Sequence, residues 1–149
     1  ASNASNFDPG NNNTGAIITF GAAQGTTVND VTIDVAGKVT FNVTGSYNIQ
    51  QIYYGQAAIN NIPILNFKTV KNGSDQIGPT STTRFKSNNS LERHRIEINS
   101  LIDVIAGSYY HFWVQNPTSG AAGQLSNQVT DAAWGTDVPC AQLIITKLQ

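Results

Sequence analysis

The side chains that could move protons, attack a substrate or bind a metal are few in this chain. The only histidines are His94 and His111, and the only cysteine is Cys140. The aspartates are dispersed and lack the alternating spacing of a calcium loop, which leaves open only a calcium site assembled from distant loops or subunits. No Gly-x-Ser-x-Gly, His-Glu-x-x-His or glycine-rich phosphate-binding motif occurs. We therefore expect a protein that is not an enzyme, with no catalytic residues, no metal-ligand set and no cofactor.

The surroundings of these residues favour structural roles. In "SYYHFWV", strand alternation puts His111 on one face with Tyr109 and Trp113, which favours a structural histidine over a catalytic one. Cys140 has apolar neighbours in "VPCAQLIITKL", which favours a buried free thiol over a reactive one. A single cysteine also excludes an internal disulfide.

A cluster of positive charge is the one candidate for binding an anion. The segment "RFKSNNSLERHR" (84–95) contains Arg84, Lys86, Arg93 and Arg95, which could together hold a phosphate or a sulfated glycan. Glu92 lies within the same segment and dilutes the charge. The alternative is a solvated strand and loop, which the near-neutral composition favours.

The composition argues against strongly charged partners. Of the 149 residues, 11% are charged and 40% are hydrophobic, and the formal net charge is −1. An average protein has about 25% charged residues, so Asn, Gln, Ser and Thr must keep this surface soluble. Such a surface predicts no nucleic-acid binding. No apolar run approaches the roughly 20 residues that span a bilayer, so we expect no membrane insertion.

The chain divides into a short polar segment and one domain. Residues 1–15, "ASNASNFDPGNNNTG", are rich in Asn and interrupted by Pro9 and Gly10, which indicates a flexible arm or linker. Residues 16–149 are expected to form a single domain. The chain begins at Ala1 and contains no methionine, so we expect a processed or excised segment of a longer polypeptide.

Short strand patterns follow one another from residue 16 onward. They are rich in Val, Ile, Thr, Tyr and Phe and are bounded by Gly, Pro, Asn or Ser, which predicts an all-β sandwich or barrel. Pro63 would break a central ladder, so we expect part of residues 57–70 to be an edge or a bulge. "KNGS" (71–74) predicts a hairpin turn. The expected strands lie within 16–20, 26–34, 38–43, 46–54, 57–70, 80–85, 93–98, 108–115 and 140–148.

The stretch "SLERHRIEINSLIDVIAG" (90–107) allows two interpretations. Leu91, Ile98 and Ile105 are seven residues apart, as on one face of an amphipathic helix. The alternation of Ile96 and Ile98 and the many β-branched residues favour a strand followed by a loop, which we adopt.

Two of the predicted strands carry aromatic or apolar side chains on both faces. One face can serve the core, and the other must be covered by a second sheet or by another subunit, unless both are buried within one chain. In 46–54 one face carries Tyr47, Ile49, Gln51 and Tyr53 and the other Ile52 and Tyr54; in 108–115, Tyr110, Phe112 and Val114 oppose Tyr109, His111 and Trp113.

Three landmarks resemble the tumour-necrosis-factor-like superfamily, and most closely the globular heads of complement and collagen-type proteins. The spacing of "GKV" (37–39) and "GSYNI" (45–49) resembles that family's Gly-x-Phe followed by Gly-x-Tyr-x-Phe, with Val39 and Ile49 in place of the two Phe residues. "LIDVIAGSYYHFWVQN" (101–116) resembles its strand entry, with Ser108 in place of the usual Asp. "CAQLIITKL" (140–148) is similar to its C-terminal core strand.

The resemblance implies an antiparallel jelly-roll sandwich of about ten strands that assembles as a homotrimer. The mismatches suggest a distant branch. The low charge, the richness in Asn, Thr and Ser, the lack of a disulfide and the polar N-terminal arm favour a viral, phage or bacterial-surface branch. Aromatic residues of the inner strands would then lie near the threefold axis. The residues implied for the trimer interface are Tyr47, Tyr53, Tyr54, Tyr110 and Phe112.

Proteins of this architecture are generally binding heads on stalks. We therefore expect a spike or fibre head on a virion surface or otherwise extracellular, which attaches to a host protein or glycan and contacts other virion proteins through its N-terminal arm. Asp131, Trp134 and Asp137 form a candidate receptor-contact loop, although Trp134 could equally fold back onto the core or the trimer seam. The alternatives are a structural minor capsid or spore-surface protein with no receptor role, and a monomeric carbohydrate-binding module.

Overall fold

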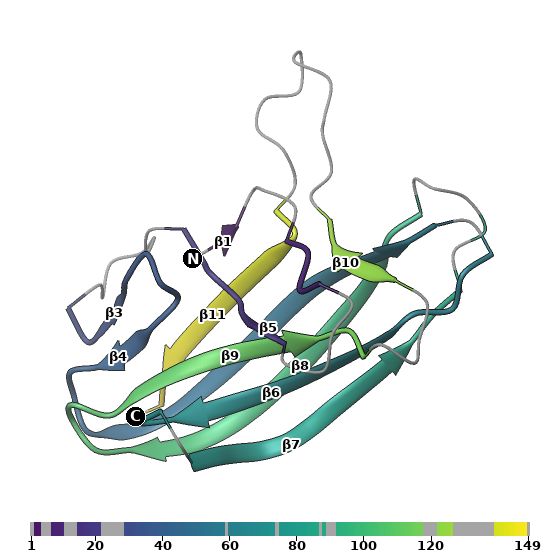
Figure 1. The fold of residues 1–149 in the computed structure, drawn as a ribbon. Coiled ribbons are helices and arrows are strands. Elements are labelled where there is room, and N and C mark those ends of the chain that lie inside the picture. Colours follow the sequence, from purple (N-terminus) through teal and green to yellow (C-terminus); the bar gives the residue numbers. More distant parts are fainter. Residues whose placement is uncertain are drawn as a thin grey trace.

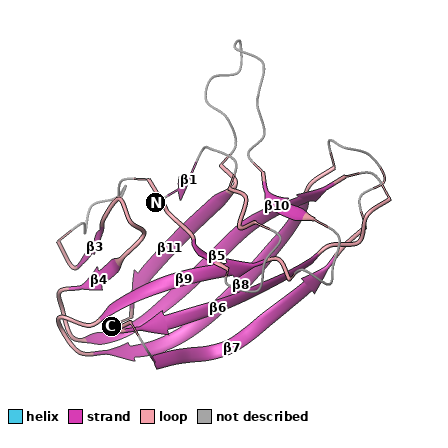
Figure 2. Ribbon diagram, in the orientation of Figure 1, coloured by secondary structure: helices cyan, strands magenta, loops and turns pink. Residues whose placement is uncertain are grey.

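The chain folds as two antiparallel β-sheets packed face to face, as the computed structural model shows (Figure 1). It describes residues 2–3, 7–10, 15–21, 29–58, 60–73, 75–86, 88, 92–117, 122–126 and 139–148. Within these ranges every regular element is a strand (Figure 2), and no helix that could cross a membrane is found there. The strands are β1 (Ser2–Asn3), β2 (Ala16–Ile17), β3 (Val31–Ile33), β4 (Val39–Phe41), β5 (Gly45–Ala57), β6 (Ile64–Lys71), β7 (Asp75–Arg84), β8 (His94–Val104), β9 (Tyr109–Gln115), β10 (Gly123–Leu125) and β11 (Ala141–Lys147).

The first sheet is built around the 13-residue strand β5. On one side β8 pairs with it from Gly45↔Val104 to Gly55↔His94. On the other side β11 pairs with residues 47–53, and β10 continues along residues 55–57. The short strand β1 adds to the far edge of β11.

The second sheet has the order β3-β4-β9-β6-β7. Strand β9 is central, with β6 on one side and β4 on the other, and β2 pairs with the part of β9 that β4 leaves open. The pairs β4–β9 and β9–β6 join strands that are distant in sequence, as in a jelly roll, whereas β3–β4 and β6–β7 are hairpins. The predicted fold class, an all-β antiparallel jelly-roll sandwich, is therefore confirmed.

Alternation along the central strands builds the core between the sheets. Tyr47, Ile49, Gln51 and Tyr53 of β5 point inward and are at most 3% exposed. The Tyr53 ring stacks on Phe67 of the opposite sheet, with 4.8 Å between ring centroids. The Tyr53 hydroxyl donates a 2.7 Å hydrogen bond to Gln51 Oε1, which satisfies the buried amide oxygen. Burial raises the pKa of Tyr53 far above its ordinary value, so the hydroxyl stays a donor.

Three local predictions have clear outcomes. Residues 94–104 form a strand, so the strand interpretation of this stretch is confirmed. Pro63 lies just outside β6, and the β6–β7 pairing changes register between Phe67 and Thr69, as the expected edge or bulge requires. Asn72 and Gly73 both have positive φ in the turn that joins β6 to β7, which confirms the hairpin.

The predicted arm over residues 1–15 requires a correction where the structure describes it. Ser2 and Asn3 pair with β11. Phe7 exchanges backbone hydrogen bonds of 2.8 and 2.9 Å with Leu125 and packs against the core. The sheet edge supplies unpaired backbone groups, and these segments satisfy them, so parts of this polar stretch belong to the folded domain.

Gly37 fixes the turn that joins β3 to β4. Its N–H donates to the Asp34 carbonyl at 3.1 Å, and Asp34 Oδ1 accepts the N–H groups of Ala36 and Lys38, each at 2.9 Å. Its φ is 82°, a left-handed value that favours glycine. A Cβ placed there would lie 2.5 Å from the carbonyl oxygen of Ile18, so backbone fills the space that a side chain would need.

We expect Gly37→Ala to destabilise the fold more than Gly107→Ala. Gly107 has a similar φ of 89° but open space around its Cβ position, so its replacement reports backbone strain alone, about 1–2 kcal/mol. The clash of Gly37→Ala with Ile18 should add about 1–3 kcal/mol. Urea unfolding of both variants measures the difference, and equal losses would contradict the close approach at Gly37.

Candidate assembly and recognition surfaces

The outer face of the first sheet is rich in amide side chains. Because β5, β8 and β11 point alternate residues into the core, the remaining positions form a second surface. We call this surface the amide face. Its outward positions are Ser46, Asn48, Gln50, Ile52, Tyr54 and Gln56 on β5, Arg95, Glu97, Asn99, Leu101 and Asp103 on β8, and Gln142, Ile144 and Thr146 on β11.

Large aliphatic side chains lie exposed on or beside the amide face. Leu101 is 70% exposed and Ile144 is 47% exposed. Leu148 continues the β11 pairing, since its N–H donates to the Ser46 carbonyl, and is 41% exposed. Ile105 directly follows β8 and is 70% exposed. These four are most of the six exposed large hydrophobic residues in the described part of the chain, so apolar exposure is concentrated here.

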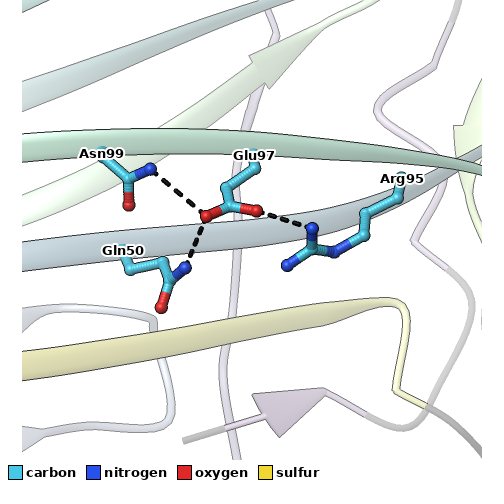
Figure 3. A network of polar contacts seen from close by, with 4 residues as sticks. All are labelled: Gln50, Arg95, Glu97 and Asn99. Atoms are coloured by element: carbon cyan, nitrogen blue, oxygen red, sulfur yellow. Dashed lines mark hydrogen bonds and ion pairs between the residues drawn. The ribbon is translucent and has the colours of Figure 1, made fainter.

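The acids on the amide face have hydrogen-bond or ion-pair partners within the chain. Glu97 accepts hydrogen bonds from Gln50 and from Asn99, the latter at 3.2 Å, and its other oxygen lies 2.7 Å from Arg95 Nη1 (Figure 3). Asp103 accepts the Ser46 hydroxyl. The hydrogen bond from Gln50 is the largest cause that lowers the pKa of Glu97 below its ordinary value, with Asn99 and Arg95 adding to it. The face therefore presents amides and aliphatic groups without unpaired acids.

The outer face of the second sheet carries a row of three aromatic side chains along β9. We call Tyr109, His111 and Trp113 the aromatic stripe. They alternate with buried Tyr110, Phe112 and Val114, and all three are half-buried. The Tyr109 and His111 rings meet edge to face, with centroids 5.7 Å apart. The prediction that these residues share one face is confirmed.

Two lysines lie over the aromatic stripe. Lys38 Nζ is 4.6 Å from the centroid of the Tyr109 ring, and Lys68 Nζ is 5.0 Å from that of Trp113. These are cation–π distances, and each contact contributes about 0.5–1 kcal/mol at an exposed site. They also hold two ammonium groups against the aromatic surface.

A polar ladder adjoins the Trp113 end of the stripe. Thr82 Oγ1 donates to Asn66 Oδ1 at 2.9 Å, and Asn66 Nδ2 donates to Gln115 Oε1 at 3.1 Å. The ladder crosses β7, β6 and β9, so its side chains are held in register by backbone pairing.

An open groove of about 340 Å³ lies at the end of the first sheet where β5 meets β10. One carboxylate and several amides line it, namely Asp8, Gln56, Asn61 and Gln124, together with small Ala and Gly residues. Asp8 Oδ1 accepts the Gly10 N–H at 2.8 Å. In the described ranges no group of three or more His, Cys, Asp or Glu residues could hold a metal ion.

Four of the five residues predicted for a trimer interface lie inside the single chain. Tyr47, Tyr53, Tyr110 and Phe112 are at most 1% exposed, because both sheets turn them toward the common core. Burial within one chain accounts for their apolar character, so they are core residues and do not offer contacts to a partner. Tyr54 lies on the amide face and is half-buried.

The other predicted sites have mixed outcomes. Phe85 stacks on His94 with 4.6 Å between centroids, which brings together the chain segments that carry Arg84, Lys86, Arg93 and Arg95. Glu92 and Glu97 lie in the same region, and Arg95 is paired with Glu97. The candidate receptor loop, Asp131, Trp134 and Asp137, lies outside the described residues. Cys140 is fully buried, which raises the pKa of its thiol to about 11 and confirms a buried thiol.

The exposed aliphatic residues of the amide face are missing from the sequence predictions. Leu101 and Ile144 occupy outward positions that are mostly polar along their strands, whereas the interface predicted from the sequence consisted of aromatic residues. Extending the alternation of Ile96 and Ile98 along β8 would have placed Leu101 on the outer face.

Comparison with known proteins supports the fold and little beyond it. No protein-family model matches the chain. No curated protein matches it either. Among solved structures, the globular domain of zebrafish complement 1qA protein is similar over 100% of this chain and 91% of that chain, with a TM-score of 0.51 and 9% sequence identity. At this identity the likeness shows the fold alone, an antiparallel jelly roll.

We expect Gln50→Leu to raise the pKa of Glu97 toward its ordinary value, because its strongest hydrogen-bond donor is removed. In the parent protein the depressed pKa stabilises the fold above the unfolded-state pKa, and this contribution is lost as the pH falls through the folded-state pKa. The variant should lose the stabilising contribution of ionised Glu97 at a higher pH than the parent protein does. Carboxyl-carbon NMR titration measures the shift, with Asn48→Leu on the same strand as the control. An unchanged titration would contradict the network in Figure 3.

Proposed function

We propose that the chain is a homotrimeric recognition head that has no enzymatic activity and attaches a virion spike or fibre to a host surface. The observation that carries the proposal is the amide face, where Leu101, Ile144 and Leu148 are exposed on a sheet whose acids are already compensated. Such a face suits burial against another copy of the chain.

The free energies of side-chain burial and of association favour an interface that combines apolar and amide contacts. Full burial of one Leu or Ile side chain contributes about 1.5–3 kcal/mol, and association costs about 4–15 kcal/mol. Three or four partly exposed aliphatic residues therefore offset roughly this cost. Any further affinity must come from hydrogen bonds made by the amides. In a closed ring of three copies each chain makes two interfaces, which doubles its contacts relative to a single interface.

The proposed location is the virion surface or another extracellular setting. The low charge and the richness in Asn, Ser and Thr support it, together with the fold shared with a complement head domain. The pairing of Ser2–Asn3 with β11 brings the start of the chain to the edge of the first sheet. From there the N-terminal segment would contact other virion proteins.

Oligomeric state in solution tests the proposal. Light scattering should give three times the chain mass, and Leu101→Arg should yield a folded monomer, because it adds a charge to the proposed interface at a site that is 70% exposed. Val35→Arg is the matched control, since Val35 is 96% exposed beside the β3–β4 turn and should leave the trimer intact. A monomeric parent protein, or a trimer indifferent to Leu101→Arg, would overturn the assembly proposed here.

Attachment is tested separately on the assembled protein. The parent trimer should bind host cells, and a trimer that binds no cell surface would favour a structural role in the capsid or coat. A monomer that binds carbohydrate would instead favour the carbohydrate-binding module.

A further inference from the structure

We infer that the aromatic stripe and the cations beside it form a binding site for an oligosaccharide that carries carboxylate groups. The inference rests on the proposed recognition role, and it names the chemistry of the partner and the face that binds it. It does not depend on the trimer, because one chain supplies every side chain involved.

The stripe has the length and the character of a site for a chain of sugars. Tyr109 and Trp113 are four residues apart on β9, so they lie about 14 Å apart at a rise of about 3.4 Å per residue. Aromatic rings offer apolar surfaces against which the C–H groups of pyranose rings can pack, and at Tyr109 and Trp113 this is the ring surface that Lys38 and Lys68 leave uncovered. His111 fills the space between them and contacts the Tyr109 ring. The rings are half-buried and fixed by the sheet, so little side-chain entropy is lost on binding.

The charges around the stripe select an acidic ligand. Neither Lys38 nor Lys68 forms an ion pair within the described part of the chain, although each lies over a ring of the stripe. Arg84 is exposed on β7 of the same sheet, where it is the register partner of Ile64 on β6. The outward positions of β4, β6 and β9 carry no Asp or Glu, and Asp34 at the nearby turn accepts two backbone N–H groups.

The polar ladder selects a sugar over other anions. Asn66 and Gln115 carry both donors and acceptors, as vicinal hydroxyl groups require, and Thr82 adds a hydroxyl. A nucleic acid carries a phosphate at every nucleotide and needs a denser set of cations than two lysines and one arginine. A carboxylated oligosaccharide uses the rings, the ammonium groups and the amides together.

The test is an NMR titration of the ¹⁵N-labelled protein with three carboxylated probes. These are a galacturonate hexamer, a hyaluronan hexamer and a sialic acid hexamer, each compared with its neutral methyl ester. At least one acid form should shift amide signals of β6 and β9, with affinity at least about tenfold above that of its ester, as loss of one charged contact predicts. Binding of no acid form, or equal binding of acid and ester, would overturn the inference. So would a single-stranded oligonucleotide that binds the stripe more tightly than every sugar.

Two lysine substitutions separate the site from general charge effects. Lys68→Gln should weaken binding of the acid form roughly tenfold and leave binding of the ester unchanged. Lys147→Gln removes the same charge from the opposite sheet and should change neither. Equal effects of the two variants would contradict a site at the stripe. A monomer that binds the acid probe would refute the proposed trimer and leave this inference standing, whereas a cell-binding trimer without probe binding would refute the inference alone.

Discussion

The two-residue alternation of β5 is the constraint on which the rest of the molecule depends. This strand is the centre of its sheet and pairs with β8 on one side and with β10 and β11 on the other. Each inward residue must fill the space against the second sheet, as Tyr53 does against Phe67. Once that phase is set, the register of β8 and β11 decides which of their residues face outward. The amide face is therefore a consequence of how the core is packed.

The two outer faces differ in a way that assigns them different roles. The amide face exposes aliphatic groups and has its acids satisfied by neighbouring side chains. The aromatic stripe exposes rings and ammonium groups with no acid beside them on the same strands. Burial of the first surface against another copy of the chain would desolvate the paired charges of Arg95 and Glu97 and one carboxylate, Asp103, that the Ser46 hydroxyl satisfies. The second surface holds two ammonium groups over its rings, and these form no ion pair in the described part of the chain, which suits a ligand of opposite charge.

Much of the fold follows from local patterns in the sequence. Most strand positions, the turn at Asn72-Gly73 and the strand at residues 94–104 were predictable, because alternation and turn residues are local signals. The short strand β10 was not predicted. The burial of Tyr47 and Tyr53 within one chain was not, since a sequence pattern cannot say whether a second sheet or a second subunit covers a face. The pairing of β1 with β11 was also beyond reach, because two polar residues at a sheet edge carry no signal of their own.

The site was less predictable than the fold for a related reason. Contacts such as Lys68 over Trp113 join strands 45 residues apart, and only the register of β6 on β9 brings them together. The Gln50–Glu97 hydrogen bond likewise depends on the β5–β8 register. The sequence indicates the histidine and the aromatic residues of the stripe, but it does not indicate that Lys38 and Lys68 lie over them, which is the basis of the inferred preference for an acidic ligand.

Hydroxyl-radical footprinting across a dilution series tests most directly the claim that copies of the chain cover one outer face and leave the other open. At high concentration Leu101 and Ile144 should react slowly and should become reactive on dilution, while Tyr109 and Trp113 react at the same rate throughout. Fast reaction of Leu101 and Ile144 at every concentration, or protection of Tyr109 and Trp113 instead, would contradict the account.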